Sequence, residues 1–314
     1  MTKRTQKPTE SAPATDLLAE LTRRIAEHSL SPGEHSTAIP GLILFRRTKA
    51  TACYRAALEP SLTVFVQGKK RMTLGGTPYL CGPSSLFLSS IDVPIESQIV
   101  EASEEVPLLS MLLLLDMSMV REMLNHEDLP ESPATSQQRG VAVGPAPAGL
   151  LKACSRLMEL LDTPEDIPFL NHLIQRDIVY RVLKTPQGAR LRTIATTGDL
   201  GNRTARAIVW LKANYAKPLH IEELAGIARM GVSTLHHQFR ALTALSPLQY
   251  QKQLRLQTAR QRMLMDGIDT SSAAYEVGYE SISQFSREYS RFFGLPPMRD
   301  VMALRAANAA TATA

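Results

Sequence analysis

Two short clusters of polar residues near the end of this 314-residue chain have side chains suited to contacting DNA bases. A guanidinium group pairs bidentately with guanine, and a side-chain amide does so with adenine. Neighbouring histidines on a helix point about 100° apart, so they do not chelate a metal from one face. We therefore expect the two adjacent histidines to contact the groove, with plain exposure as the alternative. The candidates for base contact are Ser233, Thr234, His236, His237, Ser283, Gln284 and Arg287.

Four basic residues around these clusters are candidates for binding the DNA backbone: Arg240, Lys252, Arg255 and Arg291. Phosphate contacts fix the register of a protein on DNA without selecting its sequence; for each residue, a solvated surface charge is the alternative. The charge balance favours DNA. Residues 203–305 hold 14 Lys and Arg against 8 Asp and Glu, a net charge of +6, whereas the whole chain carries +5. A basic region of this kind attracts phosphates.

Both clusters lie in a pattern that occurs twice, at 221–240 and at 270–287. Each copy has an alanine where two helices pass closely, a turn glycine that can adopt a positive φ, a serine at the start of the next helix and a core phenylalanine. These residues are Ala225, Gly231, Ser233 and Phe239 in the first copy, and Ala274, Gly278, Ser281 and Phe285 in the second.

The repeated pattern predicts two helix-turn-helix units, whose second helices would enter the major groove at Ser233–Leu242 and Ser281–Phe292. The segment 208–300 resembles the DNA-binding domain of AraC-type (AraC/XylS) transcription regulators, in which one long helix joins two such units. The likeness includes 239–250, 254–264 and Phe292–Pro297. In two places the chain departs from the family pattern: Ala244 replaces a turn glycine, and Asp300-Val301 replaces a Tyr-Arg pair.

The front half carries closely spaced β-type runs separated by Gly and Pro. Their spacing predicts a small barrel or a double-sheet jelly roll. Gly75-Gly76 is assigned to a hairpin turn rather than to a phosphate-binding loop. The predicted strands are Leu42–Arg47, Cys53–Leu58, Leu62–Gln67, Met72–Leu74, Tyr79–Cys81, Ser85–Ser89, Glu96–Glu101 and Leu108–Leu115.

Two stretches of this half, 60–75 and 79–94, resemble the cupin-like sensor half of one AraC subfamily, and the likeness covers about residues 30–130. It implies a small-molecule effector in an apolar interior, which Phe45, Tyr54, Phe65 and Tyr79 would line. One alternative is that the barrel serves only for dimerisation. Another is a cupin enzyme fused to a DNA-binding domain, but a cupin metal site needs histidines from the barrel strands. All seven histidines fall outside residues 41–115, so we expect no metal, no cofactor and no catalysis.

Residues 131–196 are expected to be helical, because apolar residues recur at helical spacing in Ala148–Leu161 and Phe169–Leu183. In related regulators, helices in this position form a dimer contact. Packing of the same apolar stripe on the chain's own barrel is the alternative, and both can hold. The resemblance implies a homodimer that binds double-stranded promoter DNA, and RNA polymerase as a further partner of an activator.

The predicted organisation is α+β: a cupin-like jelly-roll barrel with accompanying helices, then an all-α domain of two helix-turn-helix units. Cys53, Cys81 and Cys154 lack paired spacing, and the N-terminus shows no signal peptide, so we expect a cytoplasmic protein. The longest apolar run, Leu108–Leu115, is too short to cross a bilayer. The predicted segments are a disordered tail and first helix (1–29), the barrel (30–130), the helical segment (131–196), a linker (197–206), the DNA-binding domain (207–301) and a disordered tail (302–314).

Overall fold

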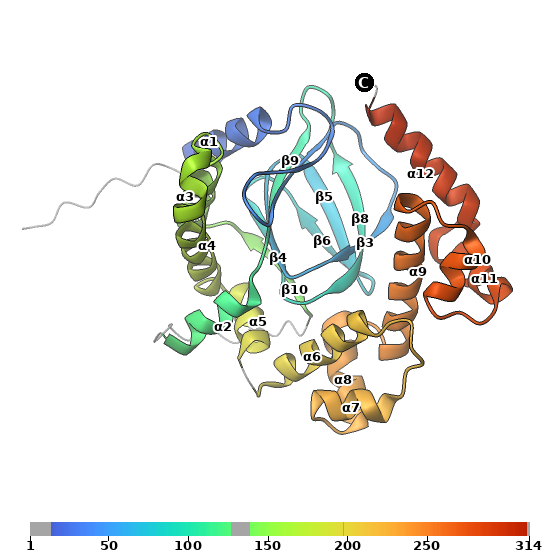
Figure 1. Ribbon diagram of the computed structural model, residues 1–314. Coiled ribbons are helices and arrows are strands. Elements are labelled where there is room, and N and C mark those ends of the chain that lie inside the picture. The colour runs from blue at the N-terminus through green and yellow to red at the C-terminus, as the bar shows by residue number, and fades with distance from the viewer. Residues whose placement is uncertain (1–13, 127–138, 197, 313–314) are drawn as a thin grey trace, which may run out of the picture.

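The computed structural model of the protein describes residues 14–126, 139–196 and 198–312. A β-sandwich lies at the centre, with the helices of residues 14–27 and 148–183 on one side, those of 247–312 on the other and those of 200–243 below it (Figure 1). The expected N-terminal tail and residues 131–138 of the expected helical segment lie outside the described residues. This arrangement confirms the α+β prediction and places the sandwich between the two helical parts.

Two antiparallel sheets form the sandwich, so of the two forms expected from the sequence, a small barrel or a double-sheet jelly roll, the structure has the jelly-roll-like one. The six-stranded sheet has the order β1-β2-β9-β4-β7-β10, and the four-stranded sheet has the order β3-β8-β5-β6. Eight strands match the predicted runs, whereas β1 and β10 were not predicted. The strands are β1 Gly33–Ser36, β2 Leu42–Arg47, β3 Tyr54–Leu58, β4 Ser61–Gln67, β5 Lys69–Leu74, β6 Thr77–Cys81, β7 Ser85–Ser89, β8 Val93–Glu101, β9 Leu108–Leu114 and β10 Val141–Pro145.

The six-stranded sheet is covered on both faces, as its central strand β4 shows. Successive side chains of a strand point to opposite faces. Leu62 and Val64 therefore belong to the core under the helices, while Phe65 belongs to the core between the two sheets. The near-continuous apolar sequence of this strand follows from its burial on both faces.

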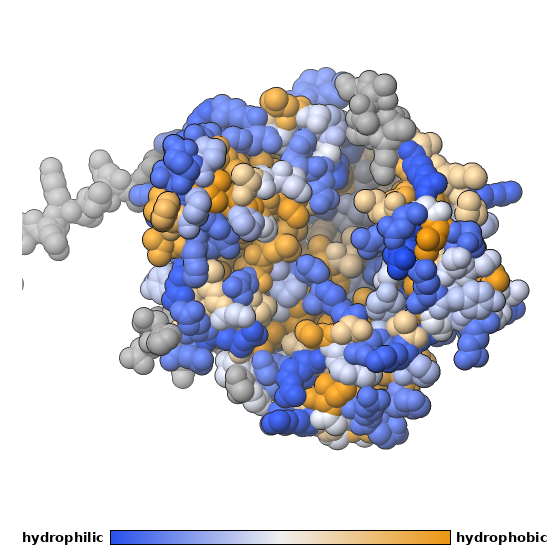
Figure 2. Space-filling model, in the orientation of Figure 1, coloured by the Kyte–Doolittle hydropathy of each residue, from blue (hydrophilic) through white to orange (hydrophobic). Residues whose placement is uncertain are grey.

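Helices before the C-terminal half cover the outer face of the six-stranded sheet. The predicted helices of this part are confirmed, and α5 is an addition. Apolar surface also remains exposed on the side of the molecule formed by α1, α3 and α4 (Figure 2). These helices are α1 Ala14–Glu27, α2 Met117–His126, α3 Ala148–Glu159, the short 3-10 turn η1 Pro164–Asp166, α4 Ile167–Leu183 and α5 Gly188–Ala195.

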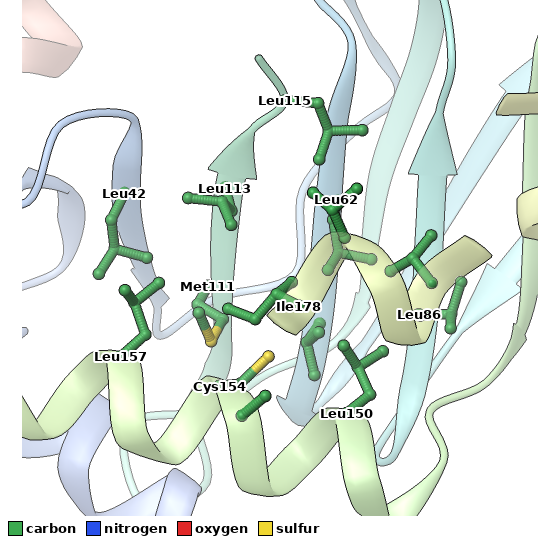
Figure 3. Packing of buried hydrophobic residues seen from close by; sticks show 14 of the residues in the cluster. Leu42, Leu62, Leu86, Met111, Leu113, Leu115, Leu150, Cys154, Leu157 and Ile178 are labelled. Carbon is green, nitrogen blue, oxygen red and sulfur yellow. The ribbon is translucent and has the colours of Figure 1, made fainter. Parts of the chain in front are cut away.

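The inner side of α3 and α4 packs on the strands, which confirms one of the two expected uses of their apolar stripe. Leu157 and Cys154 of α3 face Leu42 and Met111 of the sheet, and Ile178 of α4 lies beside them (Figure 3). Burial raises the pKa of the Cys154 thiol to about 12, so it stays protonated and acts as a small apolar side chain.

The C-terminal half is all helical, and its two helix-turn-helix units lie at either end of the long helix α9 (Figure 1). None of the helices within the described ranges combines the length and apolar character that a membrane crossing needs. The helices are α6 Leu200–Ala213, α7 Ile221–Ala228, α8 Val232–Thr243, α9 Pro247–Met265, α10 Thr270–Glu276, α11 Ile282–Phe293 and α12 Pro297–Ala312.

The structure differs from the expected segments in three places. The linker 197–206 is short, because α6 already begins at Leu200, where the Asp199 side chain accepts a hydrogen bond from the Gly201 amide at 2.7 Å. The expected tail 302–314 is helical as far as Ala312, since α12 continues there. The segment 131–196 also contains a strand, because β10 pairs with β7 in the six-stranded sheet.

Candidate nucleic-acid interface

The first helix-turn-helix unit comprises α7 and α8, with α6 packed against both. Ala225 and Phe239 are buried as the sequence predicts, and Leu235 joins them in the core. The turn differs from expectation, because Gly231 has φ −68° and the left-handed residue is Arg229, with φ +52°. Gly231 instead caps α8, and Ser233 lies in the first turn of that helix.

The second unit comprises α10 and α11, and its turn follows the prediction. Gly278 has φ +88°, and a Cβ there would overlap the carbonyl oxygen of Ala216, so both conformation and space require glycine. Ser281 caps α11 by accepting a hydrogen bond from the Gln284 amide at 3.3 Å. Ala274 and Phe285 are fully buried.

The two departures from the family pattern have local explanations. Ala244 ends α8 in the left-handed conformation, with φ +65°, where a glycine would avoid the steric cost. Asp300 is buried and accepts hydrogen bonds from the Arg260 guanidinium at 2.7 and 2.9 Å and from the Tyr289 hydroxyl at 2.7 Å. This charge-assisted cluster fastens α12 to α9 and α11.

All seven candidates for base contact lie on α8 or α11, and all seven are exposed. Ser233, Thr234, His236 and His237 are exposed on α8. On α11, Arg287 is exposed and makes no hydrogen bond or ion pair with the described part of the chain. The positions that would enter a groove are thus open to solvent, as contact with DNA bases requires.

Gln284 belongs to a polar cluster centred on Glu288. Its amide donates to Glu288 Oε1 at 3.1 Å, Lys252 Nζ lies 3.0 Å from the same oxygen, and the Tyr279 hydroxyl donates to Oε2 at 2.8 Å. Burial disfavours the charged carboxylate, but these hydrogen bonds outweigh it and hold the pKa of Glu288 below its usual range. Base contact by Gln284 would therefore require its amide to leave Glu288.

The four expected phosphate-binding residues separate into two kinds. Arg240 and Arg291 are exposed, and their guanidinium groups have no protein partner within the described ranges. Lys252 is half-buried and paired with Glu288. Arg255 has a different role, because its guanidinium donates to the backbone carbonyls of Tyr215, Ala216, Lys217 and Gly278 at 2.7–3.1 Å.

The carbonyls that accept from Arg255 lie in the loop after α6 and in the turn of the second unit. Arg255 thus ties the two units together, and burial lowers the pKa of its guanidinium, although a group with so high an ordinary pKa stays charged. The Arg255 side chain therefore has backbone partners among the described residues, unlike those of Arg240 and Arg291, and its expected contact with phosphate stays a prediction.

Contacts between the sandwich and the DNA-binding half were missed by the sequence analysis. At the C-terminal end of α8, the Gly140 amide donates to the Leu242 carbonyl at 2.9 Å, and Arg139 donates to the Arg240 carbonyl at 3.0 Å. At the end of α11, Arg55 of β3 donates to the Phe292 carbonyl. Both recognition helices are therefore fastened to the sandwich at the ends opposite their capped first turns.

A third contact joins the sandwich to α6. Lys212 forms ion pairs with Asp92 and, at 2.9 Å, with Glu59. The Tyr250 hydroxyl of α9 donates to the Asp92 carbonyl at 3.1 Å. These partners lie more than 100 positions apart in the chain, so neither periodicity nor a local motif could have indicated them.

The four aromatic residues expected to line an effector pocket all lie on strand faces that turn toward the space between the two sheets. Phe45 and Phe65 flank Ser110 on neighbouring strands of the six-stranded sheet. Tyr54 and Tyr79 lie in the row that runs through Ser97 and Met72 in the four-stranded sheet. Phe65 and Tyr79 are buried between the sheets, where Tyr79 packs edge-on against Phe87 with ring centroids 6.1 Å apart. Phe45 and Tyr54 are more exposed and flank Lys70, whose Nζ lies 5.9 and 6.0 Å from their ring centroids.

The cysteines of the sandwich and the possible metal ligands form no cluster among the described residues. Cys53 is exposed and lies just before β3, although the strand was expected to begin at this residue. Cys81 is buried, and burial raises the pKa of its thiol to about 12. Among the residues that the structure describes, no three His, Cys, Asp or Glu side chains are grouped closely enough to hold a metal ion.

Two family models match the chain. Residues 38–190 match the AraC-type transcriptional regulator N-terminus, and residues 224–300 match a helix-turn-helix domain. Among curated proteins, the HTH-type transcriptional activator RhaS of Yersinia pestis (strain Pestoides F) is 29% identical over 99 residues, which are 32% of this chain and 36% of that protein. RhaS of Escherichia coli O1:K1 / APEC is 25% identical over 155 residues, 48% and 54% of the two chains. The chain thus spans between about a third and about half of the length of these relatives.

The fold is similar to that of ToxT from Vibrio cholerae strain SCE256. An apo ToxT variant has a TM-score of 0.56 at 12% identity, covering 85% of this chain and 99% of that one. Wild-type ToxT with unsaturated fatty acid bound has a TM-score of 0.54 at 13% identity, covering 83% and 93%. At this identity the likeness establishes a shared fold. The two family models, which match both halves of the chain, show that the chain belongs to the family of AraC-type transcriptional regulators.

Proposed function

We propose that the protein is a sequence-specific DNA-binding transcription regulator whose two recognition helices, α8 and α11, bind successive major grooves. The main support is the exposure of the polar residues on the leading face of each helix, while the apolar residues of both units are buried. Major grooves on one face of B-DNA recur about every 10 base pairs, so the two contacts of one chain would be one helical turn apart.

In this proposal the residues divide by chemistry. Arg287 pairs with guanine, and Gln284 with adenine once its amide leaves Glu288. Ser233, Thr234, His236, His237 and Ser283 complete the base contacts. Arg240 and Arg291 bind phosphates, because both are exposed and lack a protein partner among the described residues. Lys252 would join them by exchanging Glu288 for phosphate.

We further propose that the N-terminal half controls DNA binding in response to a small molecule. The ToxT structure with a fatty acid bound motivates this step for the shared fold. In this chain, the sandwich contacts the C-terminal ends of both recognition helices, so a ligand that moves it would change how they are presented. A sandwich that serves only for dimerisation would lack this response.

Dimerisation is assigned to the outer face of α4. Phe169 and Leu173 of that helix are 76% and 62% exposed, and Leu170 and Tyr180 are exposed on the same helix. Large apolar side chains at helical spacing on a surface indicate a protein contact. The RhaS relatives are named transcriptional activators, so we propose activation, with RNA polymerase as the protein partner.

Selection from a randomised duplex DNA library tests the DNA-binding function. The full chain should enrich one motif over successive rounds, and the Arg287→Ala variant should relax the preference at a single position of it. The Arg71→Ala variant, altered on β5 away from both recognition helices, should enrich the same motif as the unaltered chain. Enrichment of no motif by the full chain would refute the proposal.

A further inference from the structure

A cavity of about 490 Å³ lies where α6 of the DNA-binding half faces the sandwich. Its walls come from α6, from α2 and α5, and from the residues between β7 and β8. This volume is within the range of about 300–1,000 Å³ typical of small-molecule sites. The four aromatic residues expected from the sequence are not in its walls, so this site is separate from the interior between the sheets.

The walls are mainly apolar, and one of their apolar side chains, Val209, faces solvent. Ile91, Met117 and Ile194 come from the N-terminal half, and Val209 and Trp210 come from α6. Val209 remains 61% exposed. Covering such a surface with an apolar molecule would remove it from water, which is favourable.

The cavity walls contain more basic than acidic side chains. Asp92 is the single acid of the lining and is already paired with Lys212. Arg121 and Arg206 also line the cavity, and neither forms an ion pair with a described residue; Arg121 donates only to the Ser118 hydroxyl, at 3.1 Å. Two positive charges therefore border an apolar space without acidic partners in the described part of the chain.

We propose that this cavity binds a small amphiphilic carboxylate, with its apolar body against Val209 and Trp210 and its anionic group paired with Arg121 and Arg206. Arginine is suited to this role because its guanidinium donates two parallel hydrogen bonds to a carboxylate. The inference rests on the proposed control of DNA binding by a small molecule, and it names the site and the chemical class.

The position of the cavity explains how occupancy would reach DNA. Trp210 and Val209 lie on α6, which packs on α7 and α8 of the first unit, while Met117 and Arg121 belong to α2 beside the sandwich. A ligand held between these helices links the first recognition unit to the N-terminal half. The ligand-bound and ligand-free proteins therefore favour different positions of α8 relative to the sandwich.

Trp210 is the only tryptophan of the chain and lines the cavity, so its fluorescence reports directly on occupancy. The full chain is titrated with decanoate and, separately, with decan-1-ol, which has the same apolar body without the charge. Decanoate should change the Trp210 emission saturably and bind about tenfold more tightly than the alcohol, because charge-assisted hydrogen bonds stabilise it.

Three variants test the assignment, with circular dichroism confirming that each is folded. Arg206→Gln and Arg121→Gln should each weaken decanoate binding by about tenfold and leave decan-1-ol binding unchanged. Val209→Glu should weaken both. Arg71→Gln on β5, outside the cavity, should behave as the unaltered chain. Absence of a saturable change in the Trp210 emission, or equal binding of acid and alcohol, would overturn the proposal.

Binding of duplex DNA from the library selection, measured on the same samples, separates the two claims. If DNA is bound specifically but decanoate is not, the cavity assignment is wrong and the regulator remains. If decanoate binds as expected but no DNA sequence is preferred, the carboxylate site stands and the proposed function is wrong.

Discussion

The guanidinium group of Arg55 lies 4.3 Å from the centre of the Phe292 ring and also donates a hydrogen bond to the Phe292 carbonyl. Arg55 of the sandwich thus contacts both the ring and the backbone carbonyl of Phe292, in the last turn of the second recognition helix. The corresponding end of α8 is held by Arg139 and Gly140. The N-terminal half therefore contacts both helix-turn-helix units directly.

Loss of the Arg55 contact should loosen the second unit. We expect Arg55→Ala to lower the free energy of unfolding by about 1–2 kcal/mol, since it removes a cation–π contact and a hydrogen bond from a charged donor. Amide hydrogen exchange in α11 and α12 should rise. Arg71→Ala, which removes only a hydrogen bond to Gln98, is the control. Unchanged exchange in α11 would mean that the contact does not hold the helix.

Replacing Ala244 should stabilise the protein. The left-handed conformation costs an L-residue about 1–2 kcal/mol, and part of the gain is lost because glycine makes the unfolded chain more flexible. We expect Ala244→Gly to raise the free energy of unfolding in urea by about 0.5–1 kcal/mol. Ala303→Gly, on the exposed surface of α12, should lower it by about 1 kcal/mol. Destabilisation by both substitutions would show that Ala244 is not strained.

The contrast between Arg287 and Arg291 tests the division into base and phosphate contacts. Arg287→Ala should cost about 1–3 kcal/mol on the selected DNA sequence and relax the preference at one base pair. Arg291→Ala should weaken binding to all sequences alike and reduce the salt dependence by about one phosphate contact. Fluorescence anisotropy at several salt concentrations measures both. Equal loss on every sequence for Arg287→Ala would make it a phosphate contact.

The exposed face of α4 should mediate the homodimer. A buried carboxylate without a partner strongly disfavours an apolar interface, so Leu173→Glu should convert the dimer to a monomer in sedimentation equilibrium. Leu80→Glu on β6, where the leucine is 56% exposed, should leave the mass of the assembly unchanged. A variant at Leu173 that remains dimeric would place the interface elsewhere.

The sequence predicted those parts of the fold that depend on local patterns. Eight strands and both recognition helices follow from alternation, from helical spacing and from Ser281 as a helix cap. The strand β10 was missed because it is a short run ending in Pro145, far in sequence from its partner β7. The last helix was taken for a tail because small residues dominate its end, although its first part is fixed by the buried Asp300 and Val301.

The sequence could predict which residues of the candidate interface are exposed, because exposure follows from position on a helix. It could not predict which of them have partners within the protein. Exposure of Arg287 follows from its place on α11. The role of Arg255 does not, because its four carbonyl acceptors come from residues 23 to 40 positions away. For the same reason, the charge pattern could not distinguish Arg240, which is unpaired in the described structure, from Lys252, which is held by Glu288.

The central claim is that one chain places two recognition helices in successive major grooves. Hydroxyl-radical footprinting of the full chain on the DNA sequence obtained by library selection tests it most directly. The account predicts two protected stretches per chain on one face of the duplex, centred about 10 base pairs apart, and Arg287→Ala should weaken one of them while the other persists. A single protected stretch per chain, or protection without sequence preference, would contradict the account.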